Sequence, residues 1–176
     1  GIYRVVRLCP CYAGTQWSGR AVMGIENFQS SQIYNDVICS DAFEVCGEVR
    51  KILERIQLIL DIDTDQIFDI KVILCELLQN AIQHGNDCDR RKKIHLKVCL
   101  REGNSMLEIT VVDQGCGFHI PRAVDSEFGK LSECDPMNVS ESGRGLFIVR
   151  NLSDCMEFNP SGNAITIKKK LFDVLK

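Results

Sequence analysis

The sequence predicts an α+β fold, in which helices lie on one face of a mixed, mainly antiparallel sheet as a two-layer sandwich. Two segments with helical periodicity come first, and they are followed by segments that alternate apolar and polar residues, as antiparallel strands do. The 176 residues are enough for one domain with its own core. We place this domain at residues 33–176, after an irregular tail at residues 1–32.

The composition indicates a soluble globular protein, with 45% hydrophobic residues, 26% charged residues and a formal net charge of -3. Because there is no basic surplus, we expect no nucleic acid partner. No apolar run approaches the roughly 18–20 residues that cross a bilayer, so we expect no membrane contact. The N-terminus also lacks the long apolar core of a secretory signal. We therefore expect a cytoplasmic protein.

The chain contains ten cysteines, which is many for its length. Cys46, Cys75 and Cys99 fall inside predicted regular segments, where a thiol packs as a small apolar side chain. Cys9 and Cys11 form a close pair, but no second pair or nearby histidine completes a zinc site. We expect reduced, mostly structural thiols rather than metal ligands.

The first regular elements are a strand at residues 33–40 and a helix from about Ala42 to Leu60. Asp41 and Glu44, three residues apart, form a capping box at the start of this helix. Apolar residues recur in it at spacings of three and four, which predicts one buried face. The residues of this face are Phe43, Cys46, Val49, Leu53, Ile56 and Leu60.

A second helix is expected from about Asp65 to His84, and Gly85 is placed to terminate it. Residues 94–101 and 105–113 then alternate apolar and polar side chains around a short connection at residues 102–104. This pattern predicts an antiparallel hairpin.

Residues 115–143 show no clear period. Loops of this length inside compact domains are usually functional lids or are disordered. A third helix is expected to open at Gly145, and a last strand at residues 163–171 completes the domain.

The second helix carries a polar stripe on an otherwise apolar segment. Glu76, Asn80 and His84 are spaced four residues apart and therefore share one helix face. An Asn oxygen is a neutral ligand that suits Mg²⁺, and a carboxylate can accept a hydroxyl proton as a general base. The alternative is a solvated helix face.

A second motif follows the predicted strand at residues 105–113. Asp113, Gly115 and Gly117 form a D-x-G-x-G pattern, and glycines at this spacing let a ligand approach the main chain closely. An ionised Asp offers only acceptors, so it suits an amino group such as that of adenine. The alternative is a common turn at a strand end.

A third motif, Ser142-Gly-Arg-Gly-Leu146, leads into the third helix. Glycines before a helix present unpaired backbone N–H groups to an anion, and the helix dipole favours negative charge there. Arg144 adds a charged contact for phosphate. The alternative is a capping turn.

Taken together, the motifs E-x-x-x-N-A-x-x-H-G, D-x-G-x-G-F and G-R-G-L, followed by a strand, resemble the N, G1 and G2 boxes of the GHKL ATPases, which have the Bergerat fold. The resemblance runs from about Tyr34 to Leu171. It implies ATP and Mg²⁺ as ligands, with Glu76 as catalytic acid or base, Asn80 as the Mg²⁺ ligand and Asp113 as the acceptor for the adenine amino group.

The resemblance also implies a lid at about residues 118–142 and further nucleotide-binding residues. These are His84, Gly115, Gly117, Phe118, Gly143, Arg144, Gly145, Leu146 and Asn163. His84 has a structural alternative, as a helix-end histidine whose hydrogen bonds are satisfied by local backbone. At Asn163 the family usually has Thr, so this adenine contact departs from the pattern.

Within the superfamily, the segments NAIQHG, DQGCGF and GRGLFIVRNLSD resemble most closely the anti-sigma-factor serine/threonine kinases of bacteria. This resemblance implies a kinase that binds a sigma factor or similar regulator, phosphorylates an antagonist protein and pairs as a homodimer. Two alternatives stay open. One is the ATP-binding domain of a sensor histidine kinase system, and the other is a module that binds ATP without turning it over.

Overall fold

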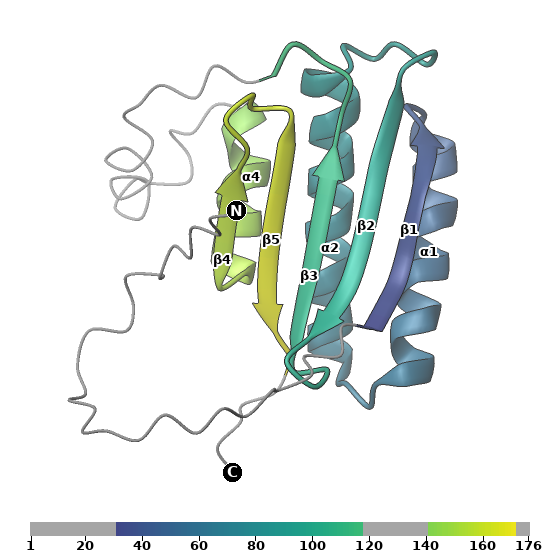
Figure 1. Ribbon diagram of the computed structural model, residues 1–176, viewed down its shortest axis with the longest axis vertical. Coiled ribbons are helices and arrows are strands. Elements are labelled where there is room, and N and C mark those ends of the chain that lie inside the picture. Colours follow the sequence, from purple (N-terminus) through teal and green to yellow (C-terminus); the bar gives the residue numbers. More distant parts are fainter. Residues whose placement is uncertain (1–30, 118–140, 172–176) are drawn as a thin grey trace, which may run out of the picture.

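The computed structural model describes residues 31–117 and 141–171, and these form two layers (Figure 1). One layer is a sheet of strand order β1-β2-β3-β5-β4, in which each pair of neighbours is antiparallel. The strands are β1 (Ser31–Cys39), β2 (Lys93–Arg101), β3 (Met106–Val112), β4 (Cys155–Phe158) and β5 (Ala164–Lys170). The helices α1 (Ala42–Ile59), α2 (Thr64–Asn80) and α4 (Glu141–Leu152) cover one face. The predicted two-layer α+β fold is confirmed.

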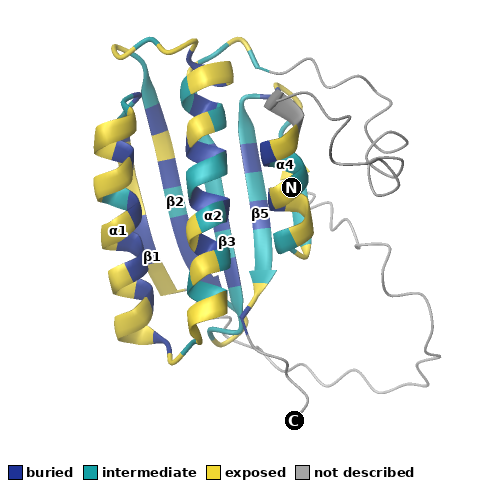
Figure 2. Cartoon of the chain, turned by 180° about the vertical axis from the view of Figure 1, so that it is seen from behind, coloured by how far each residue is buried: buried dark blue, intermediate teal, exposed yellow. Residues whose placement is uncertain are grey.

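The core lies between the sheet and the helices. Along β2 and β3, alternate residues point toward the helices and are buried (Figure 2). The largest fully buried side chains are Ile52, Ile56, Ile70, Ile73, Leu74, Leu77, Leu78, Ile94, Leu96, Leu100, Leu107 and Ile109. Burial of each such side chain stabilises the fold by about 1.5–3 kcal/mol. No helix in the described ranges is both long and apolar enough to span a bilayer.

The strand predictions hold to within a few residues, with one omission. β1 begins at Ser31, so two residues that we assigned to the N-terminal tail belong to the sheet, and the rest of that tail lies outside the described residues. The predicted hairpin is β2 and β3. β4 was missed, because four residues at the sheet edge are too few to show a period of two.

Helix α1 begins where the sequence predicts it. Oδ1 of Asp41 accepts hydrogen bonds from the backbone N–H groups of Phe43 (2.9 Å) and Glu44 (3.3 Å), as an N-cap does. Glu44 does not complete the reciprocal half of the predicted capping box. Its Oε2 accepts instead from the backbone N–H of Cys39, at 3.1 Å, and so ties the helix to the end of β1.

The predicted buried face of α1 is wrong at two positions. Phe43 is 89% exposed and Cys46 is exposed, whereas Val45 and Ile52 are buried. The true face is Val45, Val49, Ile52, Leu53 and Ile56, in which each residue has another three or four positions away. Two faces of the helix contain apolar residues, and periodicity alone did not identify which of them meets the sheet.

Helix α2 ends differently from the prediction. After Asn80 the chain widens into a π-helical turn, η1 (Ala81–Gly85), and the backbone N–H of Asn86 donates to the carbonyl of Ala81 at 2.8 Å. Gly85 does end the helical segment. It has no positive φ, however, and its lack of a side chain serves another purpose, since a Cβ there would overlap the carboxyl group of Asp113.

The third predicted helix, α4, begins at Glu141 rather than at Gly145. Gly143, Arg144 and Gly145 therefore lie inside its first turns and not in a loop before it. The first four backbone N–H groups of any helix lack an intrahelical partner, so in α4 these donors belong to residues 141–144.

Candidate functional site

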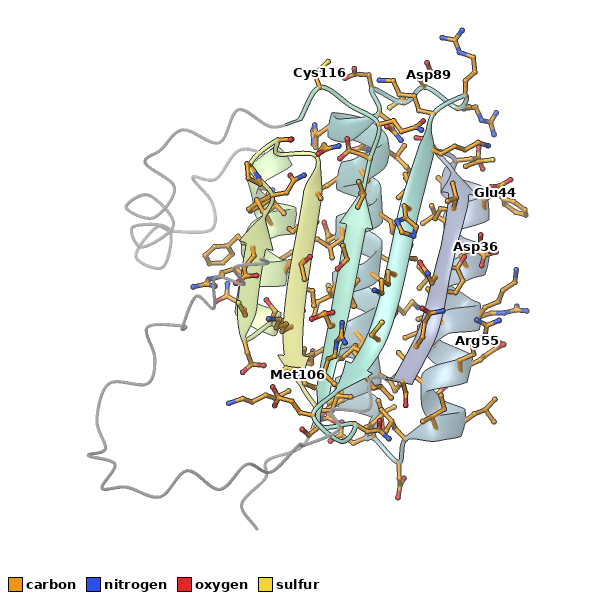
Figure 3. The ribbon with its side chains drawn as sticks, in the orientation of Figure 1. Asp36, Glu44, Arg55, Asp89, Met106 and Cys116 are labelled. Carbon is orange, nitrogen blue, oxygen red and sulfur yellow. The ribbon has the colours of Figure 1, made fainter. Side chains whose placement is uncertain are left out.

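The three sequence motifs meet at one end of the two-layer structure. Cys116, within the D-x-G-x-G segment after β3, and Asp89, in the loop before β2, mark this end, and Met106 marks the opposite one (Figure 3). A pocket here is lined by residues from α2, η1, α4, the end of β3, and β4 and β5 with their connection. They are Leu77, Asn80, Ala81, Val111, Asp113, Leu146, Phe158, Gly162, Asn163, Ala164 and Ile165.

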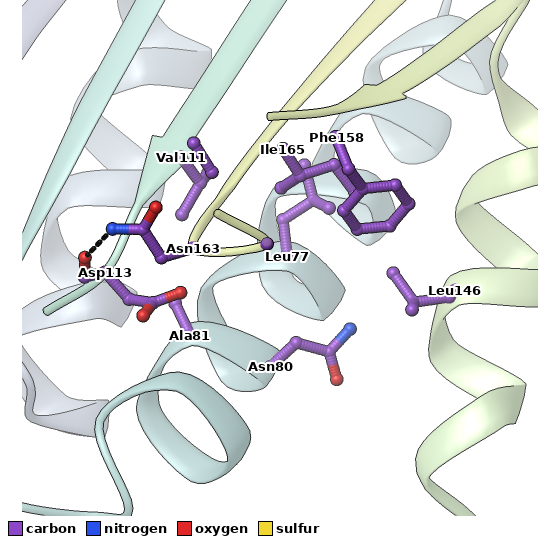
Figure 4. A pocket seen from close by; sticks show the side chains of 11 residues that line it. Leu77, Asn80, Ala81, Val111, Asp113, Leu146, Phe158, Asn163 and Ile165 are labelled. Atoms are coloured by element: carbon purple, nitrogen blue, oxygen red, sulfur yellow. Dashed lines mark hydrogen bonds between the residues drawn. The ribbon is translucent and has the colours of Figure 1, made fainter. Parts of the chain in front are cut away.

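The pocket has an apolar floor and a few polar groups at its rim. Leu77, Val111 and Ile165 belong to the core behind it, Phe158 lies beside Ile165 on the neighbouring strand, and Leu146 lines the pocket from α4 (Figure 4). Asn80, Asp113 and Asn163 contribute the polar side chains. An apolar pocket with a small number of polar groups is typical of small-molecule sites.

Asn80 carries a buried polar atom without a protein partner. Its Nδ2 is inaccessible to solvent and makes no hydrogen bond with the residues that the structure describes. Leaving a buried donor unsatisfied costs about 1–3 kcal/mol, so each such atom calls for an explanation. This orphaned amide faces α4, and it is the clearest indication that the pocket takes a polar ligand.

Glu76 lies one helical turn before Asn80, also facing α4. Gly145 of α4 lies directly against these groups, since an added Cβ there would overlap Oε2 of Glu76 and lie 3.6 Å from Nδ2 of Asn80. Gly145 is buried and has no side chain between these groups and the α4 backbone. The absence of a side chain therefore brings the first turns of α4 against a carboxylate and a carboxamide.

His84 does not continue the polar stripe. It is exposed on η1 and is not among the residues that line the pocket. In a regular α-helix it would follow Asn80 by one turn on the same face, but the wider π turn between them rotates it away. The structure thus brings Glu76 and Asn80 together and leaves His84 outside.

The D-x-G-x-G segment is packed too closely for side chains at its glycines. A Cβ on Gly115 would overlap the carbonyl oxygen of Gly85, and one on Gly117 would overlap that of Ser161. Gly117 also has a φ of +82°, which favours glycine. These contacts hold the loop between η1 and the β4–β5 connection.

The side chain of Asn86 joins the same loop to the start of β2. The sequence analysis did not identify this residue. It is fully buried, donates from Nδ2 to the carbonyl of Lys93 at 3.1 Å, and accepts at Oδ1 from the backbone N–H of Gln114 at 2.9 Å. Gln114 in turn accepts from the backbone N–H of Lys93 at 2.8 Å. No short motif distinguishes this Asn from a turn residue, so only the fold reveals its role.

Asp113 is half-buried beside the pocket. Burial raises the pKa of its carboxyl group above the usual value, while a hydrogen bond from the backbone N–H of Gly115 to Oδ1, at 2.8 Å, acts in the opposite direction. A carboxylate placed against an apolar pocket is poorly solvated. It therefore gains more than an exposed carboxylate from a ligand that donates a hydrogen bond.

Some predicted site residues lie beyond what the structure describes. Phe118 and the predicted lid, up to residue 140, are outside the described ranges. Gly143 belongs to the backbone of α4, Arg144 is exposed on that helix, and Leu146 lines the pocket. The apolar lining residues Val111, Phe158 and Ile165 were missed as site residues because in sequence they read as ordinary strand residues.

Comparison with known proteins agrees with this arrangement. Residues 40–169 match the sequence profile of the histidine kinase-like ATPase domain. The chain belongs to this family. The described sheet and helices are therefore those of a GHKL-type domain, as the resemblance implied.

Several curated proteins are similar to this chain. The anti-sigma F factor of Clostridium perfringens (strain 13 / Type A) is 28% identical over 116 residues, which cover 64% of this chain and 78% of that protein. The serine-protein kinase RsbW of Bacillus licheniformis is 31% identical over 115 residues, covering 63% and 68%. The serine-protein kinase RsbW of Bacillus subtilis (strain 168) is 26% identical over 130 residues, covering 73% and 79%.

The close approach at Gly145 predicts a contrast between two helical glycines. Replacing an exposed helical Gly by Ala stabilises a helix by about 0.8–1 kcal/mol. Gly47→Ala in α1, where a Cβ meets nothing within 4 Å, is expected to show this gain in the free energy of unfolding. Gly145→Ala is expected to lack it, because the methyl group displaces the Glu76 carboxylate. Urea unfolding measures both, and equal gains would contradict the packing described.

The raised pKa of Asp113 predicts a pH dependence of stability. Between its unfolded and folded pKa values the folded protein binds more protons than the unfolded chain, so the free energy of unfolding falls as pH rises through that window. Asp113→Asn keeps the acceptor for Gly115 but removes the charge. It is expected to be at least as stable as wild type at neutral pH, with a flatter pH profile. Thermal unfolding measured above and below the window tests this, and a marked loss of stability at neutral pH would refute it.

Proposed function

We propose that this protein is an ATP-dependent serine/threonine kinase that binds a sigma factor or similar regulator and phosphorylates an antagonist protein. The names of the similar proteins, anti-sigma F factor and serine-protein kinase RsbW, support this function. The observation that carries the proposal is the convergence of Glu76 and Asn80 on Gly145, at the start of α4 and beside the pocket that contains Asp113.

The residues present fit an ATP–magnesium complex. The orphaned Nδ2 of Asn80 suits a phosphate oxygen, and the other atom of the same amide, Oδ1, suits Mg²⁺. The main chain at Gly145 and Gly115 leaves no room for side chains, because Glu76 and the carbonyl of Gly85 fill that space, so these glycines let α4 and the loop after β3 pack closely around the site. The positive end of the helix dipole at the start of α4 favours an anion, and Arg144 extends from the same turn.

The roles follow from the chemistry of each group. Asp113 would accept a hydrogen bond from the adenine amino group, with the base lying on the apolar pocket floor. Asn80 would hold Mg²⁺, which when bound neutralises phosphate charge. Glu76 would accept the proton of the attacking hydroxyl as general base. Because phosphoryl transfer depends mainly on positioning and charge neutralisation, these groups are sufficient for the reaction.

Glu76→Gln is expected to separate nucleotide binding from phosphoryl transfer. The carboxamide keeps the size of the side chain but cannot accept a proton, so transfer should fall about 10²–10⁴-fold while the dissociation constant for ADP stays close to that of wild type. The matched control is Glu54→Gln, at an exposed position of α1 where the carboxylate of Glu54 pairs with Arg50 at 3.3 Å. Transfer that is unaffected by Glu76→Gln would show that Glu76 is not the base.

The phosphate acceptor is tested by capture from the source cell in the presence of ATP, followed by incubation of the captured proteins with labelled ATP. The proposal expects acid-stable label on serine or threonine of a captured protein, and the label should be lost with the Glu76→Gln variant. Acid-labile phosphohistidine would favour a histidine kinase system instead. ATP-dependent capture without any label would favour a binding module that uses ATP as a ligand.

A further inference from the structure

The face of the sheet that is turned away from the helices, which we call the open face, is rich in lysine and arginine. Side chains along a strand point alternately to the two faces, so the residues between the buried ones belong to the open face. Its cations are Lys93, Lys97, Arg101, Lys168 and Lys170, and its carboxylates are Glu108 and Glu157. No helix of the described ranges covers it (Figures 1 and 2). Five cations against two carboxylates leave a surplus of three positive charges on this face.

The three consecutive lysines of β5 show how the pleat divides the charge between the two faces. Lys169 points toward the helices, where its Nζ pairs with Oδ2 of Asp69 at 2.9 Å. Lys168 and Lys170 point to the open face, as does Lys97 on β2. None of these three forms an ion pair within the part of the chain that the structure describes. Three cations of the open face can therefore pair with a bound partner.

Uncharged polar side chains lie between these lysines. The hydroxyl oxygens of Thr110 and Thr166 are 3.0 Å apart and form a hydrogen bond between β3 and β5. Lys97 is paired with Thr110 across β2 and β3, and Lys168 follows Thr166 by two residues on β5. Because one strand separates β2 from β5, the two lysines belong to strands about 10 Å apart. Two turns of a helix rise by about 11 Å, so acidic side chains on one face of a folded protein can match this spacing.

The rest of the chain carries the opposite charge. The segment that forms α1, α2 and their connection contains eight carboxylates and four cations, and the whole chain has a formal net charge of -3. A nucleic acid duplex or an anionic membrane is an extended polyanion, which this negative layer repels at long range. Pairing of the open face with the same face of a second copy is also disfavoured, because a symmetric contact brings like charges together. The charge pattern therefore favours an acidic patch of limited size.

We propose that the open face of the sheet is a docking surface for an acidic patch on a partner protein. Lys97, Lys168 and Lys170 pair with carboxylates of that patch, which directs the approach and orientation of the partner. The open face lies on the other side of the sheet from the nucleotide pocket, to which Val111 and Ile165 contribute from the helix-facing side of β3 and β5. A partner can therefore dock there without covering the pocket, and this inference does not depend on the proposed nucleotide site.

The test measures binding of a fluorescein-labelled poly-glutamate peptide to the full chain by fluorescence anisotropy at low and high salt. Wild type is expected to bind the peptide, with an affinity that falls as the salt concentration rises. Lys97→Gln/Lys168→Gln is expected to weaken binding about fivefold, the effect of two exposed ion pairs. The matched control is Lys51→Gln/Lys71→Gln, at exposed positions of α1 and α2, which removes the same charge and should leave the affinity unchanged. Thermal unfolding checks that each variant is folded.

Four outcomes would overturn the proposal. If wild type does not bind the peptide at low salt, or if both double variants weaken binding equally, the open face is not a specific surface for acidic groups. Tighter binding of duplex DNA or of anionic lipid vesicles, lost in Lys97→Gln/Lys168→Gln, would assign the face to another class of partner. A dimer of the chain that this variant dissociates would assign it to a second copy. The nucleotide site is tested separately by ADP binding.

Discussion

The structure depends most on the burial of one face of α2 against the middle of the sheet. Ile70, Ile73, Leu74, Leu77 and Leu78 are at most 1% exposed, and together they fix both the height and the rotation of the helix. Because that face is buried in the core, the positions of Glu76 and Asn80 on the helix are fixed as well. They lie at the side of the helix that meets α4, where a polar group is buried only if something pairs with it.

Glycine contacts then complete the site around this helix. Gly85 makes room for Asp113, Gly115 for the carbonyl of Gly85, and Gly145 for Glu76. Each allows backbone or side-chain groups from elements distant in sequence to approach more closely than any larger residue permits. The consequence is a pocket in which an unsatisfied amide, a poorly solvated carboxylate and the start of a helix face one small volume. A nucleotide with its magnesium ion is the ligand that we propose for this pocket.

The sequence was sufficient for the fold class and for the elements with a strong period. β2, β3 and α1 begin and end within two residues of their predicted bounds, because long alternating or helical patterns leave little ambiguity. The sequence did not predict the features that depend on tertiary contacts. The exposed Phe43 shows that two apolar faces competed on α1, and the start of α4 at Glu141 lies in a segment that had no readable period.

The candidate site divides in the same way. Glu76, Asn80, Asp113 and Gly145 could be singled out as candidates because their residue types are unusual for their local context. Asn86 could not, since an Asn in a turn is common and its hydrogen bonds connect segments far apart in sequence. The π-helical turn that removes His84 from the stripe also has no sequence signal of its own.

The most direct test of the central claim is a crystal structure of the protein with a non-hydrolysable ATP analogue and magnesium. The account predicts the adenine amino group at the Asp113 carboxylate, the metal at Oδ1 of Asn80, and the phosphates at the first turn of α4. A nucleotide bound elsewhere, or one whose phosphates lie away from Asn80 and Gly145, would contradict it.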